Sequence, residues 1–170
     1  MYKIKKIILF FFISFCLNTS THAEIKIAYI DLDLILSNSN VGKELFENLK
    51  NNENLKIKEL QNKEKELKDE ENKILGSKNI ISEDQLNTDI ENFKKKLSDY
   101  KNLKKIELDK LQEKRNKEVT NLLNSINSVI EIYMTENSIS MIIDKKNIYI
   151  ANKKHDITDN LIELINKNIK

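Results

Sequence analysis

The chain has 170 residues, of which 33% are charged, 39% hydrophobic and 6% aromatic. It has no proline or tryptophan, only two glycines, and a formal net charge of +2. So few helix breakers among so many charges favour long helices over a compact globule. Phosphate-binding loops and cysteine–histidine metal clusters are excluded as well, because the residues they need are missing. We therefore predict no enzyme, no cofactor and no metal site.

Residues 1–23 have the three parts of a secretory signal peptide: basic MYKIKK, apolar IILFFFISFCLN and the cleavage signal THA before Glu24. The apolar run is short for a membrane span, which needs about 20 residues. Cys16, the one cysteine, lies within it, so the mature chain is predicted to have no disulfide. We expect export to the periplasm with cleavage; an uncleaved membrane anchor is the alternative.

Removal of this leader changes the charge balance. The leader carries three lysines and no acidic residue, so 26 basic residues remain against 27 acidic ones. A near-neutral chain does not indicate a basic surface for nucleic acid. We therefore expect no nucleic-acid partner.

The mature chain opens with EIKIAYIDL (24–32), which is rich in Ile and Tyr and predicts a β-strand. Residues 31–40 predict a short helix or turn with Asp31 as its cap. From Val41 to Leu75 the only breaker is Gly42, at the start, so we expect a helix of roughly 50 Å.

The apolar residues of this first long helix form only half a heptad seam. Leu60, Leu67 and Ile74 are seven residues apart, but the neighbouring seam positions are polar: Lys56, Lys63 and Glu70. Such a seam is enough for a loose contact between two helices, but it has few apolar positions for a coiled coil whose interface excludes water.

The stretch ILGSKNIISEDQL (74–86) interrupts the helical pattern. Gly76 is predicted to end the first helix in a left-handed conformation. Ser82 and Gln85 have the spacing of a capping box for a second helix. A helix stop followed closely by a helix start predicts an antiparallel helical hairpin with its tip near 76–82.

The second helix is predicted from Glu83 to about Tyr133. Its seam weakens at Lys104 and Glu107, where we expect the hairpin to flex, and then becomes dense toward the C-terminal end. The apolar seam positions are Leu86, Ile90, Phe93, Leu97, Tyr100, Val119, Leu122, Ile126, Val129 and Tyr133. The base of the hairpin is therefore predicted to pack against a body, and the rest to stand in water.

The C-terminal part completes that body. Residues 138–144 and 148–152 predict a β-hairpin, and residues 155–170 predict an amphipathic helix capped by Asp156 or Thr158. Three short strands with apolar residues on both faces cannot bury themselves in one chain, so we expect several copies to pool them. The candidate oligomerisation residues are Ile25, Ile27, Tyr29, Ile139, Met141, Ile143, Ile148 and Ile150.

The predicted fold class is mainly α with a small β body, and long helical-hairpin arms are inserted between the strands of a small oligomeric β-barrel. The predicted domains are a signal peptide (1–23), a body (24–40 with 134–170) and an arm (41–133).

Two stretches of the sequence resemble the Skp/OmpH family of periplasmic chaperones. IKIAYIDLDLILSNSNVGKELFENL resembles the N-terminal strand and helix start of that family, and NSISMIIDKKNIYIANKKHDITDNLIELINK resembles its C-terminal segment. The order of elements and the length match as well. The sequence departs from the family pattern in two ways. Family members often have a proline near the segment SNSN, and this chain has none. Well-known relatives are basic, whereas the mature chain is close to neutral.

The resemblance implies a jellyfish-like homotrimer whose arms surround a cavity. Such a protein is an ATP-independent holdase that encloses unfolded outer-membrane β-barrel proteins in the periplasm. Candidate client-binding residues are Leu60, Leu67, Phe93, Lys94, Lys95, Lys96 and Tyr100. Packing between the arms explains the apolar members of this set more simply than client contact does. The lysine run leaves a transient contact with a membrane or lipopolysaccharide open. The alternative function is a structural or adaptor coiled-coil protein of the cell envelope.

Overall fold

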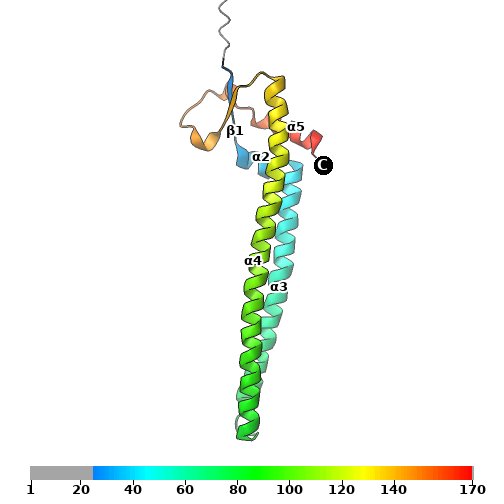
Figure 1. The fold of residues 1–170 in the computed structure, drawn as a ribbon, viewed down its shortest axis with the longest axis vertical. Helices are drawn as coiled ribbons and strands as arrows, with labels where there is room; N and C mark the ends of the chain where they lie inside the picture. Colours follow the sequence, from blue (N-terminus) through cyan, green and yellow to red (C-terminus); the bar gives the residue numbers. More distant parts are fainter. Residues whose placement is uncertain (1–24, 170) are drawn as a thin grey trace, which may run out of the picture.

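The computed structural model describes residues 25–169, so the predicted signal peptide lies outside the described residues. The chain consists of two long helices joined to a small body that holds both ends of the described chain (Figure 1). Strand β1 (Ile27–Ile30) and helix α2 (Leu32–Asn38) precede the long helices α3 (Asn40–Ser77) and α4 (Glu83–Glu136). Strand β2 (Met141–Asp144), two short 3₁₀ turns, η1 (Lys145–Asn147) and η2 (Lys153–His155), and helix α5 (Thr158–Asn168) follow.

The helix starts follow the signals in the sequence. The Asp31 carboxylate accepts the Leu34 N–H at 3.0 Å and caps α2. The Ser82 hydroxyl accepts the Gln85 N–H at 3.3 Å and caps α4. The return bond of a capping box is not made, because the Gln85 side chain donates to Asp89 instead, at 2.9 Å.

The predicted end of the first helix at Gly76 is wrong. Helix α3 continues through Gly76 to Ser77, and no glycine among the described residues has a positive φ. The carbonyl of Ser77 accepts the N–H groups of Ile80 (2.8 Å) and Ile81 (3.2 Å). These bonds close the turn within the right-handed region, so no left-handed residue is needed.

The predicted β-hairpin at 138–144 and 148–152 is also wrong. Strand β2 pairs in parallel with β1, from Ile27 opposite Met141 to Ile30 opposite Asp144, and residues 148–152 form no strand. The Asp144 carboxylate accepts the Lys146 N–H at 3.0 Å, which bends the chain into η1 and away from β2. Two parallel strands must be joined by a long crossover connection, and α3 and α4 form the main part of the connection between β1 and β2.

The body core lies where the base of α4 meets α2, α5 and β1. The buried members of this cluster are Ile30, Ile35, Leu122, Ile126, Val129, Ile130, Leu161 and Ile165. The members of this cluster that belong to α4 lie in the dense apolar stretch that the sequence places at the base of the second helix: Leu122, Ile126, Val129 and Ile130. The Asn40 N–H donates to the Asn166 side chain at 2.7 Å and ties the start of α3 to α5. The long helices therefore begin and end on one packed core.

Candidate functional site

Outside the body, α3 and α4 lie side by side and extend away from the core (Figure 1). At 1.5 Å per residue, the 54 residues of α4 span about 80 Å and the 38 residues of α3 about 55 Å. Few side chains are buried along this stretch; Leu49, Leu60 and Tyr100 are the main ones. The pair therefore offers a long, largely solvent-exposed surface.

One polar link holds the middle of the pair. The hydroxyl of the buried Tyr100 lies 2.9 Å from the Glu64 carboxylate and 3.2 Å from the Leu60 carbonyl. Lys104 reaches the same carboxylate at 3.2 Å, and its ammonium lies 5.7 Å from the centre of the Tyr100 ring. The link joins α3 to α4 in one register.

The link also changes the acidity of its members. The Tyr100 hydrogen bond, helped by Lys104, lowers the pKa of Glu64 below its usual value. Burial, followed by the neighbouring Glu64 carboxylate, raises the pKa of the Tyr100 phenol. The hydrogen bond to Glu64 raises the pKa of Lys104. All three groups therefore keep their ordinary charge at neutral pH, which suits a structural link better than proton transfer.

Two of the three polar seam positions of α3 form ion pairs with α4. Lys56 lies 3.5 Å from Glu107, and Glu70 lies 2.7 Å from Lys96. The predicted weak point at Lys104 and Glu107 is thus occupied by ion pairs in place of apolar contacts. Such pairs are exposed or half-exposed, so they contribute little to stability.

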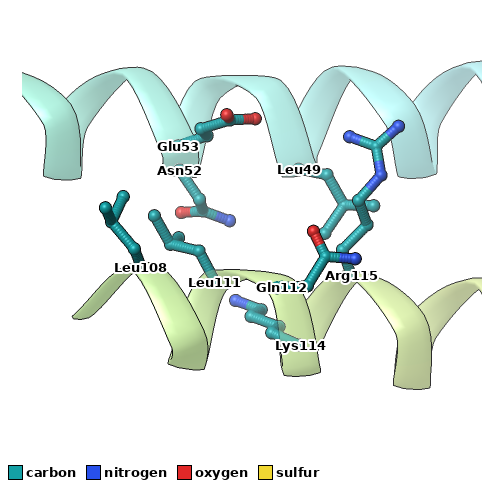
Figure 2. A pocket seen from close by; sticks show the side chains of 8 residues that line it. All are labelled: Leu49, Asn52, Glu53, Leu108, Leu111, Gln112, Lys114 and Arg115. Carbon is teal, nitrogen blue, oxygen red and sulfur yellow. The ribbon is translucent and has the colours of Figure 1, made fainter. Parts of the chain in front are cut away.

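A cavity of about 320 Å³ lies between the helices next to this polar stretch. Figure 2 shows its walls, with Leu49, Asn52 and Glu53 from α3 and the remaining labelled side chains from α4. The Arg115 guanidinium lies 6.0 Å from the centre of the Phe46 ring. The lining mixes leucines with amides and charged groups, which suits weak contacts.

The structure brings three of the candidate client-binding residues together. Leu67, Phe93 and Tyr100 line an open groove of about 390 Å³ between the helices. Leu67 and Phe93 are half-buried, whereas Leu60 and Tyr100 are 5% and 8% exposed and pack inside the pair. The lysine run 94–96 is exposed and lies outside this groove.

Other apolar side chains that the sequence analysis passed over are more exposed. They are Leu55 (63%), Leu75 (64%), Ile80 (82%), Ile106 (50%), Leu108 (43%) and Ile132 (57%). Each lies off the heptad seam or at the tip. Four of them lie off the seam next to a charged residue, whereas Leu75 and Ile80 have uncharged neighbours near the tip; these positions are the signals that could have identified them.

The candidate oligomerisation residues fall into two groups. Tyr29 and Ile139 are buried within the chain, and Ile143 and Ile148 are half-buried. The exposed members are Ile25 (70%), Ile27 (42%), Met141 (51%) and Ile150 (83%). Tyr149, which was not among the candidates, is fully exposed beside Ile150.

The small sheet has one free edge. Strand β1 pairs with β2 on one side and forms a bridge from Tyr29 to Asp156 on the other. The outer edge of β2 therefore has no strand partner within residues 25–169. Free backbone donors and acceptors beside exposed apolar side chains are suited to pairing with another chain.

Across residues 25–169, no three His, Cys, Asp or Glu side chains come close enough to hold a metal ion. In the same range, no helix combines the length and hydropathy that a membrane crossing requires.

Comparison with known proteins identifies similar sequences and folds. Residues 26–165 match the family model described as outer membrane protein (OmpH-like). A crystal structure from Caulobacter crescentus, described as a candidate outer membrane chaperone (OmpH-like), is similar with a TM-score of 0.80. It is 20% identical in sequence, and the alignment covers 90% of each chain. No curated protein has a significantly similar sequence.

Proposed function

Because the chain belongs to the OmpH-like outer membrane protein family, we propose that it is an ATP-independent holdase chaperone of the periplasm. In this proposal, the signal peptide is cleaved before Glu24, and the mature chain receives unfolded outer-membrane β-barrel proteins. It shields their apolar segments and strand edges until they reach the outer membrane. The description of the Caulobacter crescentus protein as a candidate outer membrane chaperone agrees with this function.

The observation that carries the proposal is the surface of the α3–α4 pair. Isolated apolar side chains such as Leu55, Ile106 and Leu108 are exposed between charged neighbours over most of its length. A surface of this kind offers many weak contacts and no single tight site. An unfolded chain can then be held without selection for one sequence, and released without an energy source.

We place the first client contacts in the groove of Leu67 and Phe93. Tyr100, which is buried in the pair, also lines this groove, and its hydrogen bond to the Leu60 carbonyl fixes α3 against α4 there. The lysines at 94–96 lie near this groove in sequence and would meet acidic side chains of a client. A transient contact of the same lysines with lipopolysaccharide or a membrane belongs to the same proposal.

The proposed assembly is a homotrimer with a shared β-barrel body (24–40 and 134–170) and three projecting arms (41–133). Its support is the free edge of β2, together with the exposed apolar side chains of Ile25, Ile27, Met141 and Ile150. Pairing with other copies would remove these side chains from water. Three arms on one body would then enclose a cavity.

The function is tested by dilution of an unfolded outer-membrane β-barrel protein from denaturant into buffer with and without the mature chain. We expect the light scattering of the aggregating client to fall as the chain approaches one trimer per client, without ATP. A client that aggregates to the same extent at excess chain would contradict the proposal, and an envelope coiled-coil role would then be favoured.

A matched pair of variants separates specific holding from general crowding. The triple variant Leu55→Gln, Ile106→Gln, Leu108→Gln removes exposed apolar surface from the pair and leaves the heptad seam positions unchanged; Leu108 also lines the cavity between the helices. The control Lys58→Gln, Glu113→Gln changes exposed polar residues on the same two helices. Protection should fall in the first variant and remain in the second; equal protection by both would rule out the exposed apolar residues as the holding surface.

A further inference from the structure

The cavity shown in Figure 2 has the one arginine of the chain at one of its ends. Of the 29 lysine and arginine residues, only Arg115 is arginine. Its guanidinium lies 6.0 Å from the centre of the Phe46 ring, at the distance of a cation–π contact. Within residues 25–169 it forms no ion pair. A planar guanidinium has two faces that stack on aromatic rings, and one ring can occupy only one of them.

The size and the walls of the cavity fit one aromatic side chain. Its volume is about 320 Å³, and an apolar cavity of roughly 150 Å³ is enough to hold benzene. Leu49, Leu108 and Leu111 supply the apolar part of the lining. Figure 2 shows Leu108 and Arg115 at opposite ends of the cavity. A ring between these ends would contact leucines on its sides and the guanidinium at one end.

The lining also carries groups that can bond the polar tip of such a ring. The side-chain amides of Asn52 and Gln112 both line the cavity, and each can accept a hydrogen bond. A buried tyrosine hydroxyl or tryptophan N–H needs a partner of this kind. The charged groups of Glu53 and Lys114 belong to the same lining and disfavour a long acyl chain, which would take water away from them. Tyrosine and tryptophan therefore fit the cavity best.

The surface beside the cavity is apolar. The ion pair of Lys56 with Glu107, at 3.5 Å, places the neighbouring residues Leu55 and Leu108 at one level of the α3–α4 pair. These two leucines are 63% and 43% exposed, and Leu108 also belongs to the cavity lining. An extended segment that lies on them can therefore place one of its side chains in the cavity.

We propose that this cavity receives a tyrosine or tryptophan side chain of an unfolded client, with its ring between Arg115 and the leucines. This site rests on the proposed holdase function and adds an aromatic preference to it. Outer-membrane β-barrels carry girdles of aromatic residues at both membrane interfaces, so an unfolded client exposes many such side chains. A single ring gives a weak and reversible contact, which agrees with release without an energy source.

The chain contains no tryptophan, so the fluorescence of a tryptophan in a bound peptide can be followed without background. The probes are two unstructured peptides of glycine and serine, identical except for one central tryptophan or leucine. The mature chain is titrated into the tryptophan peptide, and the leucine peptide is then added as a competitor. We expect a saturable blue shift of the tryptophan emission, and about tenfold weaker binding of the leucine peptide.

Three variants locate the binding. Arg115→Lys keeps the charge and removes the planar stacking group, so it should weaken binding of the tryptophan peptide about threefold. Asn52→Phe adds a ring of the chain itself to the cavity lining and should abolish the binding. Lys117→Gln removes an exposed charge on the same helix but outside the lining, and should leave the binding unchanged. Circular dichroism verifies that each variant keeps its helices.

Equal affinities for the two peptides would overturn the aromatic site, and so would binding of the tryptophan peptide that persists unchanged in both Arg115→Lys and Asn52→Phe. Displacement of that peptide by a dissolved short-chain phospholipid, at a lower concentration than a tyrosine peptide requires, would assign the cavity to an acyl tail instead.

The aggregation assay separates this site from the proposed function. A wild-type chain that protects an unfolded outer-membrane protein but does not bind the tryptophan peptide contradicts the aromatic site alone. A chain that binds the peptide through Arg115 but does not protect the client contradicts the holdase function and leaves an aromatic-binding cavity.

Discussion

The two glycines of the chain occupy opposite environments. A Cβ on Gly42 would lie 1.9 Å from the Leu36 carbonyl oxygen and 2.8 Å from the Ser39 hydroxyl, because the end of α2 packs directly on the start of α3. A Cβ on Gly76 would meet nothing within 4 Å, and its helical φ is open to any L-residue. Glycine is therefore required at the first position and replaceable at the second.

This contrast predicts that alanine substitutions at the two glycines change the free energy of unfolding in opposite directions. Gly42→Ala should lower the free energy of unfolding by about 1–3 kcal/mol, since backbone must shift to admit the methyl group. Gly76→Ala should raise it by about 0.5–1 kcal/mol, since alanine favours the helix. Urea unfolding followed by circular dichroism measures both. A Gly42→Ala chain as stable as the wild type would show that α2 and α3 are not in this close contact.

At the scale of elements, helices could be predicted from the sequence and strand pairing could not. Caps such as Asp31 and Ser82 act on backbone groups a few residues away, so local sequence contains the signal. The partner of β2 is β1, more than a hundred residues earlier, and a single capping bond at Asp144 diverts the chain from the expected hairpin. Likewise, a polar residue at a seam position of α3 looks unfavourable for helix packing when the sequence is read alone. Lys56 is explained only once its ion-pair partner on α4, Glu107, is known.

The link of Tyr100 with Glu64 predicts a dependence of stability on pH. The folded chain lowers the pKa of Glu64, so the ionised carboxylate stabilises the fold. This contribution is complete above the ordinary glutamate pKa of about 4.3 and is lost as pH falls through the lowered value. Urea unfolding should therefore show wild type more stable than Glu64→Gln at neutral pH, with a gap that narrows in acid.

The matched control is Glu66→Gln on the same helix, an exposed residue outside the link. Its effect on the free energy of unfolding should be small, because the side chain is exposed and makes no contact with the link. Tyr100→Phe, which removes the hydroxyl, should by itself cost about 1 kcal/mol and abolish most of the Glu64→Gln effect in a double-mutant cycle. Additive effects of the two substitutions would mean that the two side chains do not interact.

For the whole molecule, one place where the described chain leaves apolar surface uncovered is next to its small sheet. Tyr149 and Ile150 are almost fully exposed beside a sheet with a free edge, although the neighbouring core is closed. The sequence alone indicates that one chain has too few strands for its apolar residues. It could not show which candidates are used inside the chain, because burial of Tyr29 and Ile139 depends on the parallel pairing.

Candidate oligomerisation residues that are buried within the chain and those that are exposed should therefore respond differently to substitution. Ile150→Asp should leave the helical content and the fold of each chain intact but shift the assembly toward monomer, because the charge would lie in the contact between copies. Ile139→Asp should unfold the chain instead, because its side chain is 7% exposed within the body. Sedimentation equilibrium with circular dichroism distinguishes the two. An Ile150→Asp chain that assembles like wild type would remove residues 148–152 from the interface.

In the proposed assembly, several copies complete one body from which the helical pairs extend. Multi-angle light scattering on the mature wild-type chain tests it most directly, at concentrations well below those that favour crowding. We expect a single species with three times the mass of one chain, and the same mass plus one client when an unfolded outer-membrane protein is added. A well-folded species with the mass of one chain, unchanged on dilution or concentration, would contradict it.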